Sequence, residues 1–290
     1  MARGSTIIVV GAIGLFWGLN WPAVKTMLTE IPPVTIRAVS LSAASLLLAL
    51  FVAYRGERLM PERSEIGQIV LAGLLTVFGF NILVTYGQIL TETSKAAIIA
   101  YIMPALTAIF ASVLLGERMG ANRIMALAIG MAGIATMASE DLPGMIAEPL
   151  GPLIMAGSAT SWALGIIATK AYRWCIGPTA QAVWFLGVSA LACWPLVFLF
   201  EPPWNTPIPS PHVLWVLGWH ILCPMLLCYA LWTSLVGRLP ASVAAIATLM
   251  APVVAVSSSM ILLGDPASWQ KLTALGLIVL SIALTFLRRA

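Results

Sequence analysis

Long apolar stretches separated by short polar segments run along the whole chain. Ten of them reach about 20 residues, the length that a helix needs to cross roughly 30 Å of hydrocarbon. They lie near 6–28, 33–54, 66–90, 94–115, 121–139, 150–173, 177–200, 211–236, 241–263 and 269–288. The stretches are almost continuously apolar and lack the alternation of membrane β-strands, which indicates helices. The pattern therefore predicts an all-α membrane protein with ten transmembrane helices.

The composition agrees with a chain that folds in lipid. Hydrophobic residues make up 60% of the sequence and charged residues only 9%, whereas about 25% of a soluble domain is charged. The mean hydropathy is +0.99. The lipid bilayer is therefore the expected surroundings of the protein. A net charge of +4 does not indicate a nucleic-acid partner, because the basic residues are spread over several loops and form no single stripe.

The second half of the sequence repeats the first. Matched pairs at an offset of 145 positions are Trp17 and Trp162, Lys25 and Lys170, and Pro33 and Pro178, and at an offset of 148 they are Asn81 and Tyr229, Ser94 and Ser242, and Pro104 and Pro252. Residues 1–140 and 150–290 are therefore expected to form two repeats of five helices each. Because five is an odd number, the second repeat must cross the bilayer in the opposite direction, which is typical of inverted-repeat transporters.

The distribution of basic residues predicts the orientation of the chain. With the N-terminus inside, eleven of the fifteen Lys and Arg residues fall on the same side as both termini, in the terminal segments and in alternate loops. The loops of the other side carry mainly acidic residues, such as Glu140, Asp141 and Glu201. Because basic loops stay in the cytoplasm, we expect a multi-pass protein of the cell membrane with both termini cytoplasmic.

Two sequence motifs resemble a known superfamily. The stretch LFWGLNWPAVK at 15–25 resembles the first helix of the drug/metabolite transporter superfamily. The stretch AAIIAYIMP at 96–104, followed by LGER at 115–118, resembles the fourth helix of its EamA branch, and the second half repeats it at 241–252 and 263–265. Within that branch the chain looks most like the YddG-type amino-acid exporters. The resemblance implies a ten-helix basket, a central cavity near the midplane and alternating access.

Aromatic and polar residues inside the apolar stretches are the candidates for lining a substrate cavity. Asn and Tyr at membrane depth are costly when they face lipid, so they should face protein or water. Such side chains can also serve helix packing, and the sequence leaves both interpretations open. The candidate cavity residues are Trp17, Asn20, Trp21, Tyr86, Tyr101, Trp162, Tyr229 and Trp232.

Pro104 and Pro252 occupy matching positions in the predicted fourth and ninth helices. A proline in a helix interior removes a backbone hydrogen bond and costs about 3 kcal/mol, unless the freed carbonyl finds another partner. Their recurrence predicts a matched pair of hinges. Proline is also generally commoner in membrane helices than in soluble ones, which is the alternative explanation.

Four basic residues fall inside predicted spans. Lys25 and Lys170 are either gate or charge sites that meet a substrate, or side chains that reach the interface and the last carbonyls of their helices. Lys95 is a further candidate gate site, and Arg37 is similarly placed near the start of a span. Both need partners, and the sequence leaves their roles open.

Several chemistries have no basis in the sequence. No nucleotide-binding or nucleophile motif is present, and neither the four Cys nor the two His residues show a metal-binding spacing, so no cofactor and no metal are expected. All eleven acidic residues lie in loops or near helix ends. A carboxylate at membrane depth, the usual proton-coupling group, is therefore not seen.

The resemblance implies a transporter that exports small polar metabolites, with amino acids favoured. The alternatives are a carrier of a sugar-phosphate or nucleotide-sugar, which should show basic residues converging on the cavity, and a drug exporter. A protein of a different class, an integral-membrane enzyme or a structural subunit, stays a rival, although no catalytic cluster is visible. The sequence does not fix the oligomeric state and is compatible with a monomer.

Overall fold

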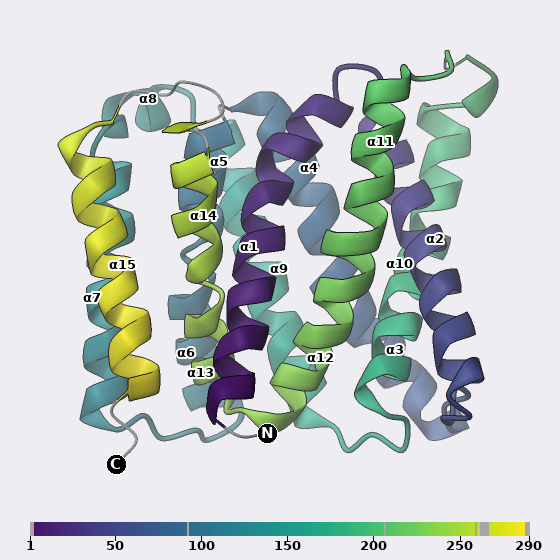
Figure 1. Ribbon diagram of the computed structural model, residues 1–290, viewed down its shortest axis with the longest axis horizontal. Coiled ribbons are helices and arrows are strands. Elements are labelled where there is room, and N and C mark those ends of the chain that lie inside the picture. The colour runs from purple at the N-terminus through teal and green to yellow at the C-terminus, as the bar shows by residue number, and fades with distance from the viewer. Residues whose placement is uncertain (1–2, 92, 206, 259, 262–266, 288–290) are drawn as a thin grey trace.

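The computed structural model describes residues 3–91, 93–205, 207–258, 260–261 and 267–287 of the chain. It is a bundle of helices that stand side by side with their axes in a common direction (Figure 1). The first repeat contains α1 (Arg3–Met27), α2 (Pro33–Tyr54), the 3-10 turn η1 (Arg63–Glu65), α3 (Ile66–Gly73), the π-helical η2 (Leu74–Gly79), α4 (Phe80–Leu90), α5 (Thr93–Ala100), α6 (Met103–Leu114) and α7 (Ala121–Ala138).

The second repeat follows a short connecting helix, α8 (Leu142–Ala147). It contains α9 (Leu150–Ala171), α10 (Pro178–Phe200), the 3-10 turn η3 (Pro203–Asn205), α11 (Pro211–His220), the π-helical η4 (Ile221–Leu227), α12 (Cys228–Arg238), α13 (Ala241–Ala247), α14 (Met250–Ser258) and α15 (Trp269–Leu287). Joined end to end where they are continuous or only briefly broken, these segments make ten crossings of the bundle. The prediction of an all-α protein with ten membrane helices is confirmed.

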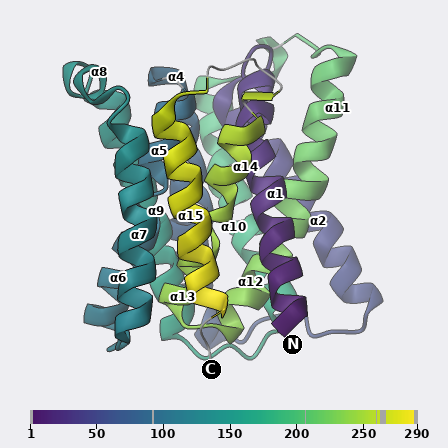
Figure 2. The same ribbon diagram turned by 60° about the vertical axis from the view of Figure 1, so that its left-hand side comes forward.

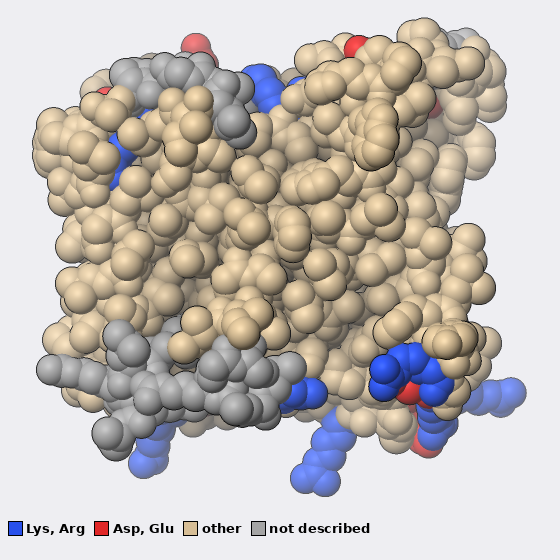
Figure 3. All heavy atoms as spheres, in the orientation of Figure 1, with Lys and Arg blue, Asp and Glu red and all other residues tan. Residues whose placement is uncertain are grey.

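The crossings have the dimensions of membrane spans. Nine of them within the described residues are long and apolar enough to cross a bilayer, and the tenth contributes the apolar segment Trp269–Leu284. On the face seen in Figure 3, uncharged residues fill the middle of the bundle, and long Lys and Arg side chains project from the end that carries the termini. This arrangement lets the apolar middle face lipid tails while the charges stay in water.

The second repeat runs opposite to the first. Both termini lie at one end of the bundle, which we call the termini end, and α8 lies at the other, the α8 end (Figure 1). Helix α1 starts at the termini end, whereas its counterpart α9 starts at the α8 end. Counterparts pack on each other as α2 with α10 and α7 with α15, and α1 packs on α14 as α9 packs on α6. The pair α7 and α15 lies side by side in both ribbon views (Figure 2).

Each repeat departs from regular helix at the same two places. The π-helical segments η2 and η4 interrupt the third and eighth crossings, and short turns interrupt the fourth and ninth crossings between α5 and α6 and between α13 and α14. Pro104 and Pro252 stand immediately after these turns, in the first turn of α6 and of α14. Since proline cannot donate to the carbonyl one turn earlier, it favours a break at that point. The proposed hinge motion at these breaks stays a prediction.

Carboxylates of one repeat hold helix starts of the other. At the α8 end, Glu201 accepts hydrogen bonds from the backbone N–H of Val34 at 3.0 Å and of Thr35 at 2.7 Å, where α2 begins. At the termini end, Glu117 accepts from the N–H of Ala241 at 2.7 Å, where α13 begins. The preceding Gly116 has a φ of +65°, which ends α6 in the left-handed turn that glycine favours. These contacts tie the repeats together, because negative charge is stabilising at a helix N-terminus.

Candidate functional site

A cavity of about 50 Å³ lies in the centre of the bundle, between the two repeats. That space is enough for a few water molecules. Its walls come from α1, α2, α4, α9, η4 and α12, and from the breaks of both interrupted crossings, through Ala100, Tyr101 and Met103 on one side and Thr248 and Ala251 on the other. Irregular backbone at membrane depth is typical of a substrate or ion site, because its free polar groups need a partner there.

Six of the eight candidate cavity residues line this space, namely Trp17, Asn20, Trp21, Tyr101, Trp162 and Tyr229. Trp232 lies behind the wall, with its ring centroid 5.4 Å from that of Trp162. Tyr86 is not among the lining residues, and 38% of its surface is exposed. Helix α4 turns Asn81, Val84 and Gln88 toward the cavity, so that the intervening Tyr86 points away.

Aromatic rings form one wall of the cavity. The matched pair Trp17 and Trp162 meets at the centre of the bundle, with ring centroids 5.3 Å apart and an interplanar angle of 82°. Phe80 lies 4.7 Å from Trp162, and Tyr229 lies 5.8 Å from Trp17. Edge-to-face packing of this kind stabilises aromatic pairs. The wall is therefore built from both repeats and is rigid and largely apolar.

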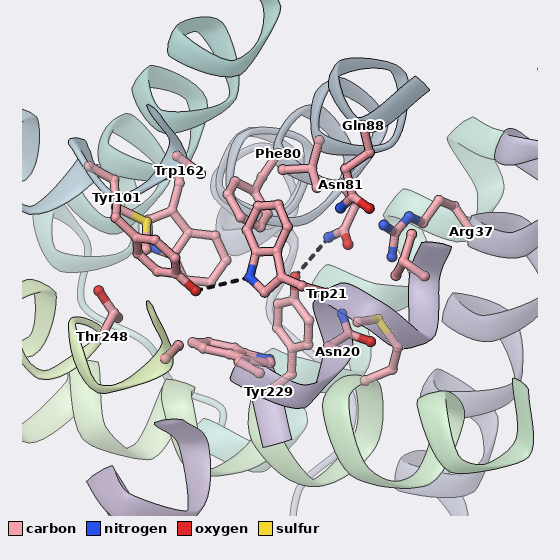
Figure 4. A pocket seen from close by; sticks show the side chains of 17 residues that line it. Asn20, Trp21, Arg37, Phe80, Asn81, Gln88, Tyr101, Trp162, Tyr229 and Thr248 are labelled. Carbon is pink, nitrogen blue, oxygen red and sulfur yellow. Dashed lines mark hydrogen bonds between the residues drawn. The ribbon is translucent and has the colours of Figure 1, made fainter. Parts of the chain in front are cut away.

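Hydrogen bonds fix the polar atoms of the wall (Figure 4). Trp21 Nε1 donates to the Tyr101 hydroxyl at 3.0 Å, and Asn81 Nδ2 donates to the Tyr229 hydroxyl at 2.8 Å. Asn81 and Tyr229 are matched positions of the two repeats, so this bond crosses the repeat boundary. Trp17 Nε1 donates to the carbonyl of Pro224 at 3.1 Å, within the π-helical η4. These bonds hold the side chains in one arrangement around the cavity.

Arg37 is the one charged residue among the described residues that line the cavity. It is 1% exposed, its Nε donates to the Thr85 hydroxyl at 2.8 Å, and its Nη1 has no partner. The Thr85 hydroxyl donates in turn to the Asn81 carbonyl at 2.7 Å. Among the described residues Arg37 forms no ion pair. Its location inside the apolar stretch 33–54 was visible in the sequence, but its orientation into the cavity was not.

A second polar contact connects the cavity to a buried histidine. His220 Nδ1 lies 2.6 Å from Asn20 Oδ1, and His220 is completely buried at the end of α11. With the amide oxygen of Asn20 as the acceptor, Nδ1 of the imidazole carries the proton and the amide nitrogen of Asn20 stays available to the cavity. His220 Nε2 has no partner. Asn20 is thereby held in position by a residue that the sequence did not single out.

Two of the three candidate gate residues, Lys25 and Lys170, are not among the residues that line the cavity. Lys25 is exposed near the end of α1. Lys170 Nζ donates to the carbonyls of Val236 at 3.1 Å and Leu239 at 3.0 Å, at the C-terminal end of α12. That contact matches the interaction with helix-terminal carbonyls that cations favour. The side chain of Lys95 lies outside the described residues, as does Asp265.

The half of the bundle toward the termini end is closed by backbone packing. A Cβ at Gly165 would come within 2.7 Å of the Thr76 Cα, so α9 can approach η2 this closely only because residue 165 is glycine. The lining residues of α1, from Trp17 to Val24, lie in its half toward the α8 end. The cavity therefore extends from the middle of the bundle toward the α8 end, whereas α9 and η2 pack closely at Gly165 in the other half.

The family model of the EamA-like transporters matches the chain twice, at residues 4–139 and 149–287. The chain belongs to the EamA-like transporter family. It is therefore a multi-pass membrane transporter of the drug/metabolite superfamily and not an enzyme. The two matches cover the two repeats, which agrees with the duplicated architecture of the bundle.

Two uncharacterized bacterial transporters match nearly the whole chain, and a probable amino-acid exporter matches part of it. An uncharacterized transporter of Bacillus subtilis, YvbV, is 27% identical over 98% of this chain and 92% of its own length. An uncharacterized inner membrane transporter of Escherichia coli, YedA, is 24% identical over 95% of this chain and 89% of its own. A probable terminal-alkyne amino-acid exporter of Streptantibioticus cattleyicolor is 26% identical over 42% of this chain and 41% of its own.

One solved structure, described as "Crystal structure of protein", superposes on the chain with a TM-score of 0.79. It is 18% identical in sequence and covers 98% of this chain and 96% of its own. This likeness supports the fold of the EamA-family bundle described above.

The site of this EamA-family chain offers binding groups and no catalytic ones. Among the described residues, no three His, Cys, Asp or Glu side chains gather closely enough to hold a metal ion. The cavity combines a guanidinium, amides and hydroxyls with aromatic faces. Such a set can hold a small molecule with polar ends and an apolar body. Sequence reasoning missed Arg37, Asn81 and Gln88 as lining residues; the signal available was a basic or amide residue inside an apolar stretch.

Proposed function

We propose that this EamA-family transporter exports amino acids from the cytoplasm by alternating access through the central cavity. The observation that carries the proposal is the cavity itself, which lies between the inverted repeats and is lined by the breaks of both interrupted crossings. Inverted-repeat transporters hold their substrates at such a place. The partial similarity to a probable amino-acid exporter and the resemblance to the YddG-type exporters support the substrate class.

The asymmetry between the two halves of the bundle supports alternating access. The cavity extends toward the α8 end, while α9 packs closely on η2 at Gly165 and Glu117 binds the start of α13 in the half toward the termini end. Because the repeats are inverted copies, the opposite arrangement can form by exchanging the conformations of the two repeats. The fourth and ninth crossings can bend at the breaks before Pro104 and Pro252, because the helix is already interrupted there and few helical hydrogen bonds have to be broken.

The polar groups of the cavity favour an amino acid over the rival substrates. A sugar-phosphate would require several basic residues, whereas Arg37 is the one cation among the lining residues. A cationic drug would meet the unneutralised guanidinium of Arg37, which repels positive charge. An amino acid carries one carboxylate, one ammonium and a variable side chain, and the aromatic wall accepts apolar side chains of different shapes.

Purified protein in liposomes tests this proposal. Liposomes preloaded with unlabelled substrate are offered labelled amino acids, phosphorylated sugars and a cationic dye. We expect exchange of several apolar amino acids and no exchange of the other two classes. Movement of a phosphorylated sugar or of the dye in the absence of any amino-acid exchange would overturn the proposed substrate class.

We also propose that the termini end faces the cytoplasm of the cell, because the basic loops gather there. Single cysteines at Arg58→Cys and Glu148→Cys, in a background without the native cysteines, test it with an impermeant thiol reagent on intact cells. Labelling of position 148 and protection of position 58 are expected. The reverse labelling pattern would invert the transporter in the membrane.

A further inference from the structure

Arg37 carries a buried positive charge that no residue of the described chain neutralises. Its 1% exposure removes nearly all contact with bulk water, and within the described residues its side chain donates one hydrogen bond, to the neutral hydroxyl of Thr85. A guanidinium has five N–H donors, and Nη1 is left without a partner. Burying an unpaired charge costs several kcal/mol, so buried charges are usually paired. The guanidinium is therefore short of an anion.

The surroundings of Arg37 hold its side chain in one orientation beside the cavity. The Thr85 hydroxyl receives Nε and is itself anchored on the Asn81 carbonyl at 2.7 Å. In Figure 4 the side chain extends from α2 toward Asn81 and Gln88 on α4. A guanidinium fixed at Nε, with a hydrogen-bond donor still unused at Nη1, is suited to a carboxylate, because the two planar groups match in geometry.

Gln88, which lines the same cavity, has an amide oxygen without a hydrogen-bond donor among the described residues. Gln88 is buried, with 3% of its surface exposed, and its Oε1 accepts no hydrogen bond. An amide oxygen without a donor is rare in a buried position and calls for a ligand or a water. Two residues that line the cavity therefore each have a buried atom without a partner among the described residues: the positively charged donor Arg37 Nη1 and the neutral acceptor Gln88 Oε1.

We infer that Arg37 binds the carboxylate of the transported molecule and that Gln88 accepts a hydrogen bond from its ammonium group. The substrate class is then a zwitterion with a single free carboxylate. This inference rests on the proposed function and deepens it by assigning the two charged ends of the amino acid. The carboxylate supplies the anion that Arg37 lacks, and the ammonium supplies the donor that Gln88 lacks, while the aromatic wall receives the side chain.

The matched positions of the second repeat show that this pair of groups occurs once. At an offset of 145, Arg37 corresponds to Ala182, and at an offset of 148, Gln88 corresponds to Val236. Both counterparts are buried and apolar. The cavity therefore offers one site for the charged ends of a substrate and not two related ones, and the substrate binds in one orientation.

Competition in proteoliposomes tests the assignment of each end. The labelled probe is L-leucine, and the competitors are leucinamide, which lacks the carboxylate, and 4-methylpentanoate, which lacks the ammonium. In the wild-type protein both competitors should be weaker than unlabelled leucine by about tenfold or more, the loss expected from one charge-assisted hydrogen bond.

Arg37→Gln should raise the half-saturation concentration for leucine by about the same factor and abolish the difference between leucine and leucinamide. Gln88→Leu should abolish the difference between leucine and 4-methylpentanoate.

The controls separate binding from folding. Arg58→Gln makes the same substitution at an exposed loop residue. It should leave the half-saturation concentration for leucine and the strength of both competitors unchanged. The melting temperature, measured with and without leucine, distinguishes a binding role of Arg37 from a structural one. Because removal of an unpaired buried charge does not destabilise a fold, the Arg37→Gln protein should melt at or above the wild-type temperature, but leucine should no longer raise it. The conservative variant Arg37→Lys should recover part of the preference for the carboxylate.

The outcomes distinguish the inference from the proposed function. Unchanged leucine affinity in Arg37→Gln, with leucinamide still excluded, would overturn the inference and leave amino-acid export standing. A fall in melting temperature in both Arg37→Gln and Arg37→Met, with no loss of the leucine-induced shift, would show that Arg37 is structural. If the wild-type protein exchanges neither leucine nor any other amino acid, both the proposed function and the inference are wrong.

Discussion

The two repeats both contribute to the walls of the cavity but line it with different chemistry. In the first repeat α1, α2 and α4 contribute Asn20, Arg37 and Gln88 to the cavity. The matched positions of the second repeat are Gly165, Ala182 and Val236. Because the repeats are inverted, matched positions lie toward opposite ends of the bundle. The polar groups of the first repeat therefore lie toward the α8 end, and the close packing at Gly165 lies toward the termini end.

This comparison separates what duplication preserves from what divergence supplies. The features common to both repeats are mechanical: the π-helical segments, the breaks before Pro104 and Pro252, and the central tryptophans Trp17 and Trp162. The features found in one repeat are chemical. A transporter needs matched moving parts to reach two access states, but it needs only one set of binding groups for one substrate.

The largest effect is expected at Gly165, where the packed half depends on the absence of a side chain. Gly165→Ala places a Cβ against the backbone of Thr76, which cannot move as a flexible side chain would. Overpacking costs about 1–3 kcal/mol, so the ratio of closed to open states should fall by about 5- to 150-fold. This can be measured in nanodiscs with a variant that lacks the native cysteines and carries a cysteine at the buried position Ala168. The fraction of that cysteine labelled by a thiol reagent should rise. Gly157→Ala is the control, because a Cβ there meets only the Leu83 Cδ1 at 3.6 Å. Equal labelling in both variants would disprove the closure at Gly165.

The next effect concerns the two breaks that the repeats share. Pro104→Ala and Pro252→Ala allow α5 to continue into α6 and α13 into α14, because alanine supplies the missing N–H. We expect each variant to slow leucine exchange several-fold while changing substrate binding less. Pro195→Ala, within the uninterrupted α10, is the control. Wild-type exchange rates in both break variants would remove the hinge hypothesis.

A smaller effect should distinguish the carboxylates at the two ends. Glu117→Gln weakens the contact between the first repeat and the start of α13, and Glu201→Gln weakens the contact between the second repeat and the start of α2. Each is expected to lower stability by about 1 kcal/mol, the scale of a helix N-terminal contact. Only Glu117→Gln should raise the labelling of the cysteine at Ala168, since only Glu117 lies at the termini end. If Glu201→Gln raises that labelling as much, the two ends are not distinct.

The smallest effect is a pH dependence at the α8 end. Hydrogen bonds from the Ser210 backbone N–H and hydroxyl hold the pKa of the exposed Glu30 below its ordinary value of 4.5. Because the folded-state pKa is the lower one, this contact stabilises the protein above the ordinary pKa and is lost as the pH falls through the folded-state value. The melting temperature of the wild type should exceed that of Glu30→Gln at pH 7, and the difference should shrink below pH 4.5. A difference that does not change with pH would exclude titration of Glu30 as its cause.

The sequence by itself determined the membrane class, the ten crossings and the duplication. Each of these follows from properties that act along the chain: the length of apolar stretches, the rigidity of proline, and the spacing of matched residues. The same local logic located the breaks near Pro104 and Pro252. Six of the eight aromatic and polar candidates line the cavity, because a polar group inside a membrane helix has few other places to face.

Only the tertiary structure decided which side chains meet. Tyr86 and Gln88 are both polar residues of α4, two positions apart, and the rotation of that helix against its neighbours directs one outward and the other into the cavity. In the sequence Arg37 is one of several basic residues near a span end, and only the packed bundle shows that it is buried, bonded to Thr85 and without an acidic partner among the described residues. Burial and unpaired hydrogen-bonding groups depend on contacts between distant segments, and no pattern along one chain contains that information.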